Sequence, residues 1–164
     1  MAQIIPLESA AAERRHAVAP ERSRAAVRTD AVYVVFTSID DTLAAVRVAH
    51  DFANAMAVPL TLIHLRVVPY SLPVDEPTGV SPVETVGFVG RLRAEGFNLR
   101  VRVCLCRGER RAIPGAFKPH SLIVMAGRRS WWPTRTERWR RALEAAGHFV
   151  VFVDGSEDKE RSDA

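Results

Sequence analysis

The sequence predicts an α/β protein in which a parallel β-sheet lies between two layers of helices. Five short apolar stretches, rich in β-branched and aromatic residues, have the length of buried strands rather than of helices. Helical segments with apolar spacing or capping signals separate most of these stretches. Strands that alternate with helices form a parallel sheet with helices on both faces. A chain of 164 residues suits one such domain.

The first strand is expected at AVYVVF, residues 31–36, and the second at LTLIHLRVV, residues 60–68. Between them, DTLAAVRVAHDFANAMA carries apolar residues three and four positions apart, which is typical of an amphipathic helix. Asp40 or Asp41 is the expected N-cap of this helix, because a short carboxylate accepts hydrogen bonds from the first free N–H groups. Pro59 follows the end of the helix.

The second half of the chain repeats the pattern. Ser81 and Glu84 have the spacing of a capping box and open a helix that ends at Gly96. LRVRVCLC, residues 99–106, is typical of a half-buried strand at a sheet edge. A short, proline-interrupted helical piece precedes SLIVMA, residues 121–126, which is the next buried strand.

The last helix is expected to open at Thr134, with Glu137 completing a capping box, and to turn Trp139 toward the core. HFVVFVD, residues 148–154, is the last strand. The helix and this strand complete the order strand-helix-strand-helix-strand, then a short helical piece, then strand-helix-strand.

The chain divides into one domain and two flanking segments. Residues 1–29 have no sustained apolar face and are predicted to form a disordered basic arm. The domain spans residues 30–155, and residues 156–164 form a charged tail.

Three stretches in this order and spacing resemble the universal stress protein family. LTLIHLRVVP resembles the second strand of that family, with a histidine followed by an apolar residue, here His64 and Leu65. EGFNLRVRV is similar as well, and SLIVMAG resembles the family's DLIVMG. The resemblance covers roughly residues 31–154. It implies a three-layer sandwich of the adenine nucleotide alpha hydrolase-like type, with five parallel strands in the order 3-2-1-4-5.

The family commonly dimerises by pairing its fifth strands. Here the fifth strand is FVVFV, which is apolar on both faces, and a bare edge strand of this kind is an aggregation hazard. The resemblance therefore implies a homodimer whose interface is formed by Phe149, Val150, Val151, Phe152 and Val153.

One branch of the family binds ATP, with an Asp at the end of the first strand and the motif G-x2-G-x9-G-[ST] after the fourth. Glycines in such a loop let backbone N–H groups approach the phosphates. In this sequence Thr37 stands at the Asp position, and Asp40 replaces it only if the first helix shifts by nearly a turn. Neither alignment of the glycine motif restores more than one glycine: the positions hold Ala126, Arg129, Trp139 and Arg140, or Gly127, Ser130, Arg140 and Arg141. The comparison with the motif predicts that the ATP site of the family is missing.

A candidate anion crevice is expected where the loops after the first and fourth strands meet. Its residues are Thr37, Asp40, Leu65, Gly127, Arg128, Arg129 and Ser130. Two interpretations stay open: the guanidinium groups bind a smaller phosphate such as AMP, or the loop is a solvated basic turn.

Positive charge is concentrated in residues 107–141, which hold ten Lys or Arg and two acids, a net +8 in a chain of net charge +4. Such a region attracts phosphate esters, nucleic acid or acidic protein faces, so a nucleic-acid-binding surface is a further hypothesis. Trp131 and Trp132 either stack on bases, fill the vacated pocket or face a partner.

The leading hypothesis is a non-enzymatic stress-response or signalling domain that acts as a homodimer without ATP and has an unidentified protein partner. No motif pairs a nucleophile with a base, and no ligand spacing predicts a metal site or another cofactor. Cys104 and Cys106 are expected to be buried thiols. We expect a cytoplasmic protein without membrane contact, because the sequence has no secretory signal and no long apolar run.

Overall fold

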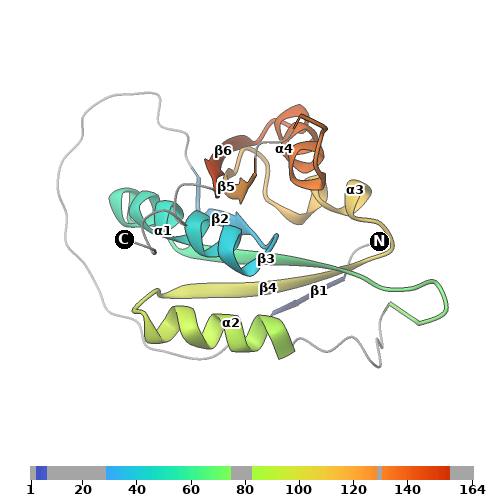
Figure 1. The fold of residues 1–164 in the computed structure, drawn as a ribbon, viewed down its shortest axis with the longest axis horizontal. Helices are drawn as coiled ribbons and strands as arrows, with labels where there is room; N and C mark the ends of the chain where they lie inside the picture. Colours follow the sequence, from blue (N-terminus) through green and yellow to red (C-terminus); the bar gives the residue numbers. More distant parts are fainter. Residues whose placement is uncertain (1–2, 7–28, 75–82, 129–130, 156–164) are drawn as a thin grey trace.

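The computed structural model describes residues 3–6, 29–74, 83–128 and 131–155. Its single sheet has the strand order β1-β4-β3-β2-β5-β6 (Figure 1). The bounds are Gln3–Pro6 for β1, Val32–Val35 for β2, Leu60–Val67 for β3, Leu99–Cys106 for β4, Leu122–Gly127 for β5 and Phe149–Asp154 for β6. The five strands from β2 to β6 are all parallel and, counted among themselves, follow the order 3-2-1-4-5. The predicted fold class is confirmed.

Strand β1 corrects the prediction that the whole of residues 1–29 is disordered. It pairs antiparallel with β4 in a register that places Ile4 beside Cys104 and Pro6 beside Arg102. QIIP is too short to stand out in a sequence pattern, yet β4 offers an open edge to it, and proline is tolerated on an edge strand. The rest of the predicted arm, residues 7–28, and the predicted tail lie outside the described residues.

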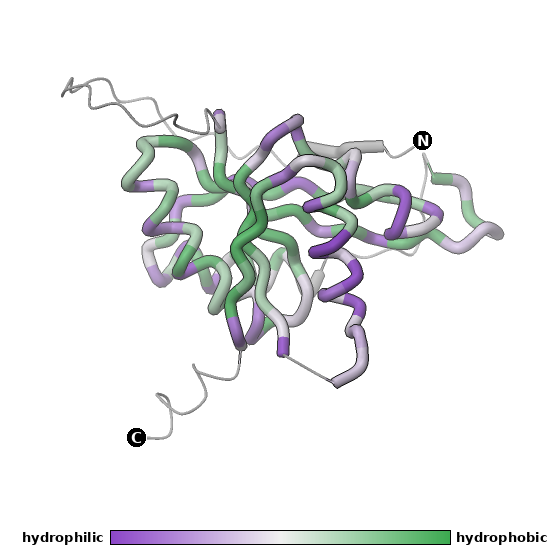
Figure 2. The backbone as a smooth tube through the Cα atoms, turned by 90° about the horizontal axis from the view of Figure 1, so that it is seen from above, coloured by the Kyte–Doolittle hydropathy of each residue, from purple (hydrophilic) through white to green (hydrophobic). Residues whose placement is uncertain are grey.

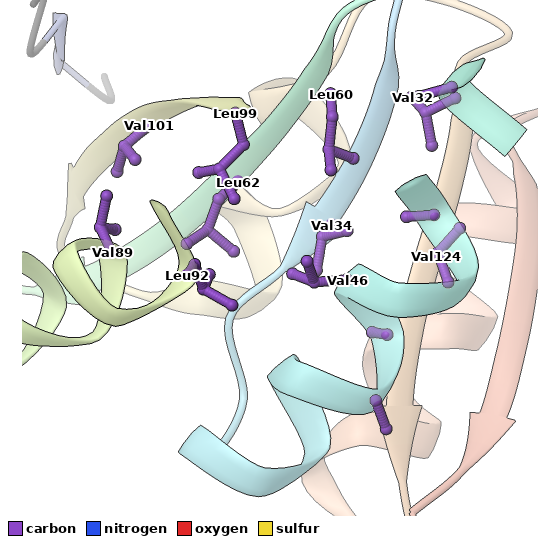
Figure 3. Close-up of a cluster of buried hydrophobic side chains, with 14 of the residues drawn as sticks. Val32, Val34, Val46, Leu60, Leu62, Val89, Leu92, Leu99, Val101 and Val124 are labelled. Atoms are coloured by element: carbon purple, nitrogen blue, oxygen red, sulfur yellow. The ribbon is translucent and has the colours of Figure 1, made fainter. Parts of the chain in front are cut away.

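Helices cover both faces of the sheet. On one face, α1 (Ile39–Met56) and α2 (Val83–Ala94) pack over a cluster of buried residues that includes Val34, Leu62 and Val124. Figure 3 shows side chains from these strands and helices pointing toward one another. The other face carries α3 (Glu109–Ala112), a 3₁₀ turn at Pro114–Ala116 and α4 (Arg135–Ala145), which cover a second cluster. Hydrophobic positions accordingly concentrate in the central strands (Figure 2).

The helix caps agree with the predictions in part. Thr134 is the N-cap of α4, and its side chain accepts a hydrogen bond from the backbone N–H of Glu137, as predicted. The N-cap of α1 is Ser38, not Asp40 or Asp41, because α1 begins earlier and the Ser38 hydroxyl accepts the hydrogen bond from the Asp41 N–H. The predicted cap at Ser81 lies outside the described residues.

In the described ranges, no helix combines the length and the apolar character that crossing a bilayer would require.

Candidate functional site

The carboxyl ends of β2 and β5 lie side by side at the centre of the sheet, where ligands bind in doubly wound folds. Thr37 follows β2, and Gly127 ends β5. The Thr37 hydroxyl donates a hydrogen bond to the Ala126 carbonyl oxygen at 3.3 Å, and the Thr37 N–H donates to the Thr42 hydroxyl at 3.1 Å. Thr37 therefore joins the ends of the two strands to the first turn of α1.

The carboxylates of α1 differ in their surroundings. Asp40 is exposed on the first turn of the helix. Asp41 accepts a hydrogen bond from the Ser38 hydroxyl at 2.8 Å, and its carboxylate also lies directly against the backbone of Gly155, so closely that a Cβ at Gly155 would collide with it. The Gly155 N–H donates to the Gly127 carbonyl oxygen at 3.3 Å. Contacts within the chain thus join Thr37 to the end of β5, and Asp41 to Gly155 beyond the end of β6.

Gly127 serves close packing within the protein. A Cβ at this position would lie 3.0 Å from Thr136 Cγ2 and 3.3 Å from Phe152 Cζ. These distances are shorter than an ordinary contact, so any side chain here would crowd its neighbours. Glycine therefore allows the first turn of α4 to approach the end of β5. The same closeness leaves the Gly127 Cα covered by side chains rather than open to a phosphate.

The structure describes two of the remaining residues of the predicted crevice, Leu65 and Arg128, and places them in different surroundings. Leu65 is buried in the second core cluster, under α3 and α4. Arg128 is exposed, while Arg129 and Ser130 lie outside the described residues. Of the predicted set, the structure brings together Thr37 and Gly127 and places Asp40 on the solvent side of the crevice.

His64 is a core residue. Its ring is buried, its Nδ1 lies 2.5 Å from the Thr85 hydroxyl, and it stacks on Phe36 at 4.4 Å between ring centroids. Burial, helped by the positive charge of Arg66, lowers the pKa of His64 to about 4. The imidazole is therefore neutral near pH 7.

Cys104 and Cys106 are both buried free thiols, and burial raises the pKa of each. A thiol with a raised pKa is a poor nucleophile and a poor metal ligand. The expected packing role of the two cysteines is confirmed.

The sequence prediction missed a groove on the outer side of α4. We call it the edge groove, because it runs along β6, at the end of the strand order. It encloses about 510 Å³ and is lined by Arg128, Trp131, Trp132, Pro133, Thr134, Glu137, Arg140, Arg141, Glu144, Val150 and Phe152. Trp131 and Trp132 are 95% and 76% exposed. The two indoles therefore do not fill the crevice between β2 and β5 but belong to a separate surface.

Among the described residues, β6 forms an edge of the sheet. The Phe149 N–H donates to the Ser121 carbonyl oxygen at 2.9 Å, and the Gly155 N–H donates to Gly127. Because a strand alternates its hydrogen-bonding direction, the backbone groups of Val150 and Phe152 point away from β5. Their side chains line the edge groove, so polar backbone groups and an apolar floor occur side by side.

The basic region is neutralised more than its sequence suggested. Glu109 pairs with Arg135, and Asp30 pairs with Lys118 at 3.0 Å. Arg140 bonds both Glu137 at 2.6 Å and Glu144 at 2.7 Å. The hydrogen bond from Arg140 is the main cause that lowers the pKa of Glu137 to about 2.

Arg107 is held by contacts within the chain. It donates hydrogen bonds to the carbonyl oxygens of Val68, Pro69 and Leu72 and lies 5.2 Å from the ring centroid of Tyr70. A count of charges within residues 107–141 could not reveal the neutralisation of the basic region. Two of the acids that pair with it, Asp30 and Glu144, lie outside that stretch. The paired arginines leave a smaller surface for nucleic acid than a net charge of +8 implies.

No protein-family model matches the sequence, and no curated protein matches it. The geometry itself therefore carries the functional argument.

Proposed function

We propose that this chain is a universal stress protein-like, non-enzymatic domain that acts in the cytoplasm as a homodimer in stress response or signalling, without ATP. The observation that carries the proposal is the close packing at the ends of β2 and β5, where Thr37 bonds to Ala126 and Gly127 is covered by Thr136 and Phe152. In a doubly wound fold this is the place where a nucleotide would bind.

The contacts in the crevice argue against a triphosphate. Asp41 brings a carboxylate to the crevice, and a negative charge there opposes a phosphate. Gly127 is covered by Thr136 and Phe152, and its carbonyl oxygen accepts a hydrogen bond from Gly155. A triphosphate would therefore meet a carboxylate and a glycine covered by side chains, both of which lower its affinity.

Calorimetric titration with ATP, ADP and AMP tests this part of the proposal. We expect no binding heat and no change in melting temperature at 1 mM nucleotide, which is about a thousandfold above a micromolar Kd. A micromolar dissociation constant for any of the three would refute the proposal in its ligand-free form. Tight binding of AMP alone would favour the alternative in which Arg128 holds a single phosphate.

The homodimer is supported by the edge position of β6 and by the outward backbone groups of Val150 and Phe152. Antiparallel pairing with a second copy would satisfy these groups and remove the open edge. A two-fold axis perpendicular to the sheet produces this pairing, and two-fold dimers are the commonest closed assemblies.

Val150→Pro and Val150→Ala form a matched pair that tests the dimer. Both variants lose the valine side chain, but only proline removes the outward N–H, while the hydrogen bonds to β5 come from neighbouring residues. We expect light scattering to find a dimer for the wild type and for Val150→Ala, and a monomer for Val150→Pro. A wild-type chain that stays monomeric at high concentration excludes pairing through β6.

A further inference from the structure

The edge groove extends from the residues that precede α4 to the last turn of α4 and the start of β6. At one end stand Arg128, Trp131, Trp132, Pro133 and Thr134. At the other end, Glu144 lies in the last turn of α4 and Val150 lies near the start of β6. The indoles at one end are exposed, and at the other end the lining combines the apolar Val150 with Arg141 and Glu144.

Antiparallel pairing of β6 with its copy brings opposite ends of the two grooves together. The carboxyl end of the partner's β6 then lies beside the start of β6, and the partner's β5 lies two strand spacings away, about 10 Å. In the register of the chain, Gly127 at the end of β5 is level with Asp154 at the end of β6. The partner's loop after Gly127 therefore begins level with the start of β6. That position is close to the end of the groove that Glu144 and Val150 line.

We propose that the edge groove is the docking site for Trp131 and Trp132 of a second copy, which cover Val150, Arg141 and Glu144. The proposal rests on the homodimer proposed above and adds the contact that holds it. Each copy inserts its indoles into the other's groove, so each groove is complete only in the dimer.

The surface area that a stable dimer must bury supports a second copy of the chain as the occupant of the edge groove. Pairing of one six-residue strand with its copy buries little side-chain surface. A buried indole covers about 150–250 Å², so four of them cover about 600–1,000 Å². Specific interfaces bury about 1,200–2,000 Å² in total, and the indoles supply a large part of that area.

The charges of the groove also favour a copy of this chain over a polyanion. The lining has three arginines and two glutamates, and Arg140 is already bonded to both glutamates. Arg141 is paired with Glu137 through its Nε at 3.1 Å while its side chain stays two-thirds exposed, so its guanidinium plane is accessible to an indole ring. Because the charged lining residues nearly cancel and Val150 and Phe152 are apolar, the groove suits an aromatic side chain. It attracts the phosphates of a nucleic acid only weakly.

The double variant Trp131→Ala/Trp132→Ala tests the docking. The two side chains are 95% and 76% exposed, so the variant is expected to stay folded, with the far-ultraviolet circular dichroism of the wild type, while its dimer dissociation constant rises by about 30-fold or more, as for interface hot spots. Tyr70→Ala is the matched control, because Tyr70 is an 85% exposed aromatic residue beyond β3, away from β6. Sedimentation over a concentration series measures all three proteins.

Fluorescence gives a second readout. The variant Trp131→Phe/Trp132→Phe keeps only the buried Trp139, and subtracting its spectrum isolates the two loop indoles. We expect their emission to shift to shorter wavelength as the wild type dimerises. A wild-type dimer whose loop indoles stay solvent-exposed, and whose affinity survives the alanine variant, overturns the docking but leaves the homodimer standing. A monomeric wild type overturns both proposals.

Discussion

Acidification is expected to destabilise the protein through His64. The imidazole is buried between Phe36 and the Thr85 hydroxyl, and its pKa falls from 6.5 to about 4. Between these two pH values the unfolded chain binds a proton that the folded chain does not, so the free energy of unfolding decreases as the pH falls. At 1.36 kcal/mol for each unit, the loss amounts to about 3 kcal/mol. That is a large part of the total of about 5–15 kcal/mol that is usual for a domain.

Urea denaturation at several pH values between 7 and 4 measures this loss, with His64→Gln as the reference. Glutamine does not titrate in this range, so the difference in unfolding free energy between wild type and variant isolates the histidine from the carboxylates that titrate in both proteins. The wild type should lose about 3 kcal/mol more than the variant as the pH falls from 6.5 to 4. Parallel pH profiles for the two proteins would show that His64 is not held neutral by its surroundings.

Substitutions at three further positions, two at α4 and one on α2, test packing, capping and helix propensity, each by its shift of the urea midpoint. Leu143→Ala removes a fully buried side chain from the inner face of α4 and should lower the free energy of unfolding by about 2–5 kcal/mol. A decrease below about 1 kcal/mol would mean that α4 does not pack as described. Thr134→Ala removes the N-cap of α4 and should cost about 1 kcal/mol, whereas Thr134→Ser should cost much less. Gly90→Ala fills open space on α2 and should stabilise the protein by about 0.5–1 kcal/mol, and a destabilised variant would contradict the open surroundings of Gly90.

The fold was predictable because its signals are local and repeated. The strands from β2 to β6 and the Thr134 cap each depend on a few neighbouring residues, and all of them agree with one architecture. β1 escaped prediction because its four residues become a strand only where β4 presents an open edge. The cap at Ser38 escaped because two aspartates follow it, and only the start of α1 decides which side chain reaches the free N–H groups.

For the candidate site, the sequence predicted which residues follow the strand ends but not the contacts that these residues make. Sequence spacing located Thr37 and Gly127 at the crevice, since both follow directly from the ends of strands. The contact of Gly155 with Asp41 joins residues more than a hundred positions apart, so no local pattern signals it. The same holds for Arg140, whose pairing with Glu137 and Glu144 depends on the helix face that each side chain takes.

Gly127 explains why the crevice and the edge groove differ in accessibility. A glycine at the end of this strand can serve one close approach only, and here the approaching group is Thr136 in the first turn of α4. The loop before that turn then holds its bulky residues on the outer side, where Trp131 and Trp132 are exposed beside β6. Replacing Gly127 by alanine would push α4 away from β5 and disturb the groove together with the crevice. The packing of α4 against Gly127 thus accompanies the exposure of Trp131 and Trp132 that the proposed docking uses.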